Sequence, residues 1–179
     1  MGSDVCATIE TVPDDFFTAC KGKKSACRME KVPAYFYQER DKFLKNFVST
    51  SPRAKQVPDL YAMRVPCKST FGGRWFAPGY LGAPRASIVV ILTGGDYERG
   101  VLYHELTHWG RWVDDLDKLG RHDRAFLGEV EKAYRAFAID AEVGRAIEHD
   151  PKGFLVGKTP GIAHDVAPRE PGNCYGMAR

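Results

Sequence analysis

Residues 104–109 read HELTHW, and this stretch constrains the fold more than any other part of the chain. Its two histidines stand four residues apart, a spacing that puts both on one side of an α-helix, about 40° apart around the axis and ~6 Å apart along it. Apolar residues recur at helical intervals from about residue 97 to 119, and Gly120 is a natural stop. We therefore expect a helix over 97–119 that carries His104 and His108 on one face.

Two imidazoles on one helix face suit a shared zinc ion, to which ring nitrogens bind at about 2.0–2.1 Å. Glu105 lies about 100° around the helix from His104, beside such an ion rather than bound to it. A carboxylate in that place can accept a proton from a zinc-bound water. The sequence therefore predicts His104 and His108 as zinc ligands and Glu105 as the catalytic base. The alternative is that both histidines merely pack against their apolar neighbours.

A zinc site of this kind needs a third protein ligand, and several acids compete for that place. Asp114 follows His104 by ten residues, the offset of the HExxHxxGxxH/D pattern, but Arg111 stands where that pattern needs a glycine turn. A second helix is expected over 123–149, because this stretch is rich in alanine and Asp150-Pro151 closes it. Small residues flank Glu142 in FAIDAEVGRA and allow a close approach to the first helix. We favour Glu142 as the third ligand, with Asp114 as the alternative.

The segments before the motif predict one helix and a pair of strands. Residues 32–50 place aromatic and aliphatic side chains on one helical face, with Pro33 in the first turn. Residues 51–70 hold three prolines and are expected to be irregular. RWFAPGYL and SIVVIL, within residues 71–93, are two apolar runs joined by a Gly-Pro turn and are typical of β-strands. Gly94-Gly95 ends the second run, and Asp96 is the expected N-cap of the helix that follows.

The chain predicts a single α+β domain over residues 1–179, with a small mixed sheet packed on the HELTHW helix and a second long helix. Residues 1–30 are expected to form an irregular N-terminal segment and residues 150–179 an irregular C-terminal tail. The basic cluster in and after the first segment is read as a solvated loop, or else as a contact with an acidic partner: Lys21, Lys23, Lys24, Arg28 and Lys31.

Composition narrows the class of protein. Hydrophobic residues make up 44% and charged residues 27% of the chain, as in globular proteins. The net charge of +3 is too small to predict a nucleic-acid partner. No apolar run approaches the roughly 18–20 residues of a membrane span, and no basic segment followed by an apolar one predicts a signal peptide. None of the five cysteines forms a CxxC pair, but one or two disulfides, and hence an oxidising compartment, are compatible with their positions.

HELTHW followed by DAEVGRA resembles the zincin metallopeptidases in their glutamate-liganded branch. The two motifs are similar to those in zincin-like domains of plasmid antirestriction proteins and of bacterial polymorphic-toxin and secretion-system effectors. GGRWFAPGYLGAPRASIVVIL is similar to the strand pair that precedes the motif in those domains. The resemblance covers about residues 70–149. It implies zinc-dependent hydrolysis of a protein or peptide that adds as a strand beside the active-site helix, with SIVVIL as the edge strand or its neighbour.

The function expected from these features is that of a zinc metalloendopeptidase, an effector or toxin domain delivered by a bacterial secretion system. Its partners would be the substrate and a secretion carrier or an immunity protein. An oxyanion-stabilising group is also needed, and the sequence offers His122, His164, Tyr134 and Tyr175 without choosing between them. The alternative function is a zinc-stabilised binding module without essential proteolysis, in which basic residues near the N-terminus contact DNA or protein.

Overall fold

The structure is a computed structural model that describes residues 28–64, 72–80, 83–117 and 120–149. In chain order its elements are β1 (Arg28–Glu30), α2 (Ala34–Asn46), the short 3-10 helix η3 (Pro52–Lys55), β2 (Asp59–Arg64), β3 (Gly73–Phe76), β4 (Ser87–Ile91), α3 (Gly95–Val113), α4 (Arg124–Ala136) and α5 (Ala141–Ile147). Helices packed on a small mixed sheet confirm the predicted α+β class. The expected tail over 150–179 and all five cysteines lie outside the described residues. Within the described ranges, no helix combines the length and apolar character that crossing a bilayer requires.

The sheet has four strands in the order β1-β2-β4-β3. The two apolar runs predicted as strands pair antiparallel as β3 and β4, with Trp75 opposite Ile88. β2 lies parallel to β4 on its other side, and β1 pairs antiparallel with β2. Two of these strands were not expected, because β1 falls in the segment read as irregular and β2 in the proline-bearing stretch after α2. This order leaves β3 at one edge of the sheet, and SIVVIL is the neighbour of that edge strand.

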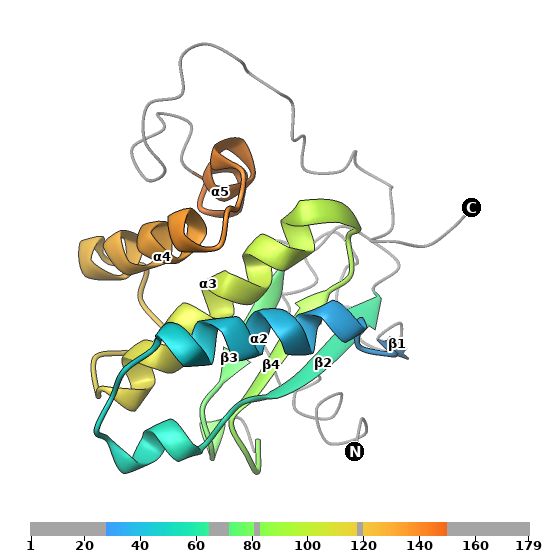
Figure 1. The fold of residues 1–179 in the computed structure, drawn as a ribbon. Coiled ribbons are helices and arrows are strands. Elements are labelled where there is room, and N and C mark those ends of the chain that lie inside the picture. Colours follow the sequence, from blue (N-terminus) through green and yellow to red (C-terminus); the bar gives the residue numbers. More distant parts are fainter. Residues whose placement is uncertain (1–27, 65–71, 81–82, 118–119, 150–179) are drawn as a thin grey trace.

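The helix α3 runs through the centre of the molecule and is buried along nearly its whole length. It packs against β3 and β4 on one side, while α2 lies beside it and α4 and α5 lie on its other side (Figure 1). Leu102, Tyr103 and Leu106 are completely buried, so each adds roughly 1.5–3 kcal/mol of hydrophobic stabilisation. This packing fixes the rotation of the helix and therefore the direction in which its polar residues point.

The start of α3 differs from the expected N-cap at Asp96. The helix begins at Gly95, with Gly94 as its N-cap at a φ of 80°, a conformation that favours glycine. Glu98 in the first turn accepts hydrogen bonds from the backbone N–H of Thr93 at 3.0 Å and of Gly94 at 2.9 Å. The side chain of Glu98 therefore satisfies donors at the end of β4 and the beginning of α3, which ties strand to helix.

The single second helix expected over 123–149 is two helices. The N-cap Asp123 accepts a hydrogen bond from the N–H of Phe126 at 2.8 Å and starts α4, which ends at Ala136. The chain then turns through Ala138, which has a φ of 53°, and Asp140 caps the start of α5. This break changes which acids of the segment point toward α3.

Candidate metal centre

Three histidines converge at the C-terminal half of α3. His104 and His108 come from this helix, as predicted, and His122 comes from the loop before α4. The Nε2 atom of His122 lies 3.2 Å from that of His104 and 3.1 Å from that of His108. Two nitrogens bound to one tetrahedral zinc ion are about 3.3 Å apart, given metal–nitrogen distances of 2.0–2.1 Å. The three side chains therefore have the spacing of a group that could hold a metal ion.

Carboxylates accept hydrogen bonds from two of the three imidazoles at Nδ1, the ring nitrogen that is not part of the cluster. The Nδ1–H of His104 donates to Glu148, at the C-terminal end of α5, and the Tyr134 hydroxyl donates to the same carboxylate at 2.7 Å. The Nδ1–H of His108 donates to Asp117 at 3.1 Å. Donation through Nδ1 leaves Nε2 to act as the ligand atom, and this carboxylate–histidine arrangement orients imidazoles in metal sites generally. The donor set therefore fits a metal ion.

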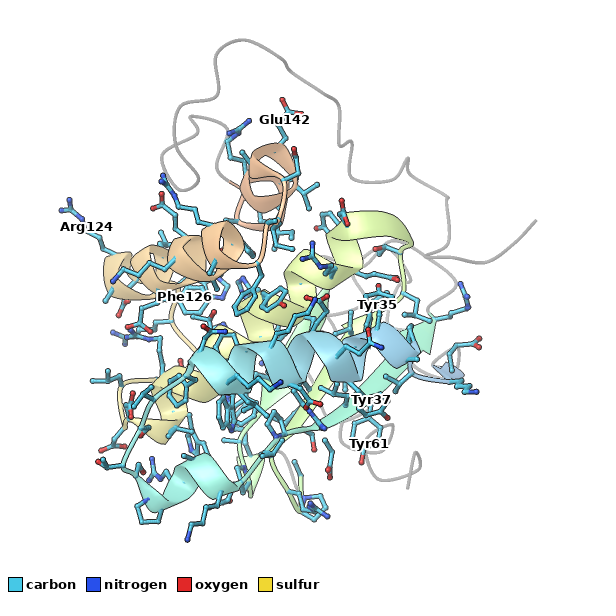
Figure 2. All side chains as sticks on the ribbon, viewed as in Figure 1. Tyr35, Tyr37, Tyr61, Arg124, Phe126 and Glu142 are labelled. Carbon is cyan, nitrogen blue, oxygen red and sulfur yellow. The ribbon has the colours of Figure 1, made fainter. Side chains whose placement is uncertain are left out.

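The structure places the predicted third ligand elsewhere. Glu142 lies at the start of α5, at the top of that helix and away from α3 (Figure 2), and its carboxylate is 3.7 Å from Arg145. The break after α4 is the reason, because it rotates the following acids so that Glu148 faces His104. Asp114, the alternative, ends α3 and accepts a hydrogen bond from Ser49 at 2.7 Å. The histidine cluster includes neither of these two acids.

Phe126 forms the apolar wall of the cluster. Its ring, which projects from α4 (Figure 2), stacks on His108 with 4.2 Å between ring centroids and on His122 with 4.9 Å. It also meets His104 edge-on at 4.9 Å. Phe126 is completely buried. Such a wall excludes water from one side of a metal site and strengthens electrostatic interactions within it.

The charges of the histidines differ in the absence of a metal. Burial lowers the pKa of His104, but the adjacent Glu148 carboxylate raises it by more, so the net pKa of His104 is raised. His122 is exposed overall, but partial desolvation of its ring, together with the neighbouring His104 and His108, lowers its pKa to about 4. Near neutral pH, His122 is therefore uncharged and presents a lone pair, the form that a metal ion requires.

A cleft of about 460 Å³ opens beside the histidines. Its walls come from the edge strand β3, the turn after it, α3 and the α3–α4 loop: Gly73, Arg74, Trp75, Ala77, Tyr80, His104, Glu105, His108, Asp117, Gly120 and His122. Glu105 is buried, with an exposed fraction of 5%. A Cβ atom on Gly73 would lie 3.3 Å from the Cγ atom of Glu105. The absence of a side chain on Gly73 therefore lets β3 approach the helix at the predicted catalytic base.

The other residues considered for stabilising an oxyanion have different positions. His122 belongs to the cluster itself. Tyr134 is completely buried and donates to Glu148 behind His104, rather than facing the cleft. His164 and Tyr175 lie outside the described residues. The sequence did not predict the place of His122 in the cluster, and the one signal it offered was the position of His122 directly before the helix N-cap Asp123.

Comparison of the chain with protein-family models, with curated proteins and with solved structures found no match. The chemistry of the histidine cluster therefore follows from the residues of this chain alone.

Proposed function

We propose that the protein is a zinc-dependent peptidase whose metal ligands are His104, His108 and His122. The observation that carries this proposal is the convergence of the three Nε2 atoms beside Glu105 in an open cleft. Three protein ligands are the usual number at catalytic zinc sites, which keep a fourth position for water or substrate. A purely structural zinc site normally has four protein ligands.

Glu105 supplies the proton transfers in this proposal. A zinc ion held by the three histidines would act as a Lewis acid toward water and toward the scissile carbonyl. Glu105 takes the proton of the attacking water as the carbon–oxygen bond forms, and it gives that proton to the amide nitrogen as the carbon–nitrogen bond breaks. Its burial at the base of the cleft keeps the carboxylate close to the reacting atoms and away from bulk water.

The edge strand β3 is the proposed substrate platform. One side of β3 is paired with β4, and residues 73–75 of this strand line the cleft. An extended peptide can add to a free strand edge through backbone hydrogen bonds, with alternate side chains entering pockets. A peptide bound in this way would lie across the histidines. We therefore propose an extended polypeptide, rather than a compact small molecule, as the substrate.

The test is hydrolysis of a mixture of fluorogenic peptides by the zinc-loaded protein and its Glu105→Gln variant. We expect the variant to lose activity at least ~100-fold, the contribution typical of an acid–base catalyst, while it keeps its zinc content. Glu131→Gln is the matched control, because Glu131 pairs with Arg135 on the outer surface of α4. Equal hydrolysis by wild type and Glu105→Gln would disprove the assigned role.

The binding-module alternative makes the opposite prediction, because it needs zinc and the fold but not Glu105. Its basic residues Lys21, Lys23 and Lys24 lie outside the described residues. Neutralising them would weaken binding to DNA and flatten its salt dependence if DNA were the partner. We favour the peptidase, because Glu105 lines the same cleft as the histidines.

The setting in a secreted toxin or effector, with a secretion carrier or an immunity protein as partner, rests on the resemblance of HELTHW and its surroundings to such domains. Expression of wild type and Glu105→Gln in bacteria, directed to the cytoplasm or to the periplasm, tests this setting. We expect growth arrest in one compartment with the wild type only. Equal growth with both proteins in both compartments would contradict the toxin hypothesis and leave the peptidase hypothesis in place.

A further inference from the structure

The loop between α3 and α4 carries two parts of the metal centre. Asp117, near its beginning, accepts from His108, and His122, near its end, supplies the third ring nitrogen. A loop is held in place less firmly than a helix unless specific contacts fix it. The position of His122 therefore requires an anchor, and one buried side chain contacts the loop at both ends.

Arg111, in the last turn of α3, holds the beginning of the loop. Its carbonyl oxygen accepts from the N–H of Leu116 at 2.7 Å and from that of Asp117 at 3.2 Å. Its guanidinium donates through Nη2 to the carbonyl oxygen of Leu116 at 3.1 Å. The backbone and side chain of one residue thus fix the segment that presents the Asp117 carboxylate to His108.

The same guanidinium also reaches the end of the loop. Nη2 of Arg111 lies 3.8 Å from the carboxylate of Asp123, the residue after His122, and Nη1 donates to Glu129 on α4 at 2.8 Å. Arg111 is 6% exposed. It therefore joins the end of α3 to the start of the loop, to the residue next to the third histidine, and to α4.

Fold stability alone explains this arginine poorly. Among the described residues, its buried Nε atom has no hydrogen-bond partner. Burying a guanidinium is costly, and an apolar side chain of similar size is often neutral or stabilising in such a place. Arg111 also occupies the position at which the HExxHxxGxxH/D pattern has its glycine turn. In this chain, α3 instead continues to Val113, and the Arg111 side chain contacts the loop that follows.

We propose that Arg111 is a positioning residue for the metal centre: it folds the α3–α4 loop back so that His122 and Asp117 meet the helix-borne histidines. The proposal rests on metal binding by the three histidines, which is part of the proposed function, and does not require that the protein cleaves peptides. It predicts that loss of the guanidinium acts on metal affinity chiefly through His122, because the bonds to the Arg111 carbonyl oxygen, which hold the segment before Asp117, do not involve the side chain.

The experiment measures zinc affinity by competition with a chromophoric chelator, and the absorption spectrum of the cobalt-loaded protein, for wild type and Arg111→Met. We expect affinity to fall by roughly tenfold or more, as for other residues that orient metal ligands. The cobalt spectrum should shift toward that of His122→Ala. Arg135→Met is the matched control, since Arg135 pairs with Glu131 on the outer face of α4, and its affinity should equal that of wild type.

A double mutant separates positioning from general weakening of the fold. If Arg111 acts through His122, then Arg111→Met should lower affinity much less in the His122→Ala background than in wild type. Equal losses in the two backgrounds, or an affinity for Arg111→Met within twofold of wild type, would overturn the proposal. If Arg111→Met does not fold, Glu129→Gln replaces it, because this change weakens the ion pair between Arg111 and the half-exposed Glu129. The same two criteria then apply.

Failure of the wild type to bind zinc would refute the proposed function together with this inference. Zinc binding by the wild type that is unchanged by Arg111→Met would refute the inference alone. Zinc binding without hydrolysis by the wild type would refute the peptidase and leave the role of Arg111 standing.

Discussion

His104 and His108 reach the histidine cluster from one buried helix, whereas His122 reaches it from a loop. The helix residues are positioned by hydrogen bonds to neighbours four residues away and by packing along the whole length of α3. The loop residue is positioned by contacts between groups far apart in the sequence, such as that between Arg111 and Glu129. One site therefore combines two residues positioned by local helical spacing with one residue that is positioned only when the loop has folded.

The largest expected effect comes from removing a ligand from either part. We expect His108→Ala and His122→Ala each to weaken zinc binding by about 3 kcal/mol or more, roughly a hundredfold, which is a proportionate share of the 10–16 kcal/mol seen for small zinc domains. Glu142→Ala is the control, and metal analysis should find its zinc content unchanged. Loss of zinc in Glu142→Ala but not in His122→Ala would instead support the ligand set expected from the sequence, with Glu142 in place of His122.

Removing the charge of the carboxylates that accept from the histidines should give the next largest effect. Glu148→Gln and Asp117→Asn should each lower zinc affinity by about 10–100-fold, because each replaces the charged acceptor that orients an imidazole with a weaker, neutral amide oxygen. We expect the larger loss for Glu148→Gln, since Glu148 is also held by Tyr134 and is the more rigid support. Chelator competition measures both variants. A larger loss in Asp117→Asn would show that the loop, and not the α5 side, dominates the orientation.

The pH dependence of metal binding should also differ between the two parts. Because the pKa of His104 is raised, its ring is predominantly in the charged form with both nitrogens protonated at pH 6.5 in the metal-free protein, whereas His122, with a pKa of about 4, is already neutral. Zinc binding at pH 6.5 should therefore release a proton from His104 and almost none from His122. Calorimetry in two buffers of different ionisation enthalpy counts the protons, and Glu148→Gln should reduce the count.

The same pKa values set the sign of the stability change of the metal-free protein. The depressed pKa of His122 means that the unfolded chain binds a proton more readily than the folded one between pH 6.5 and about 4, so His122 lowers stability as the pH falls through this range. The raised pKa of His104 acts in the opposite direction, and its stabilising contribution is lost as the pH rises through that pKa. Urea unfolding of His122→Ala at several pH values separates the two, because this variant should lose less stability on acidification.

The smallest expected effects concern the packing of β3 on α3. A Cβ on Gly73 would lie 2.7 Å from Val101 and 2.8 Å from the carbonyl oxygen of Val89, so Gly73→Ala should lower the free energy of unfolding by about 1–3 kcal/mol. Gly128, within α4, has open space around it, and Gly128→Ala should stabilise by up to ~1 kcal/mol. Urea unfolding measures both. A destabilised Gly128→Ala, or an unaffected Gly73→Ala, would contradict the packing described here.

The sequence predicted the parts of the molecule that depend on local periodicity. The helix expected over 97–119 exists as Gly95–Val113, and the pairing of β3 with β4 followed from two apolar runs and a turn. The break after α4 was missed because Ala138 adopts a left-handed conformation, and no glycine or proline in this turn predicts that the helix ends there. β2 was missed because prolines flank it, although DLYAMR supplies half-buried alternation along much of the strand.

The third histidine required information that no local pattern contains. The position of His122 depends on the turn after α3, on the contacts of Arg111 with the loop and on the start of α4. These three features come together only in the folded chain. Glu142, the predicted third ligand, lies outside the cluster for the same reason. That prediction assumed one continuous helix, whereas the chain breaks between α4 and α5, and Glu148 is the acid that contacts His104.

The wall formed by Phe126 has a kinetic consequence. It covers the histidine rings on the α4 side, while Glu105 and all three histidines line the cleft beside β3. Metal ions and peptides would then pass through the same opening. A peptide bound along β3 would block this opening. The rate at which a chelator removes zinc from the protein would therefore report how long each peptide stays bound.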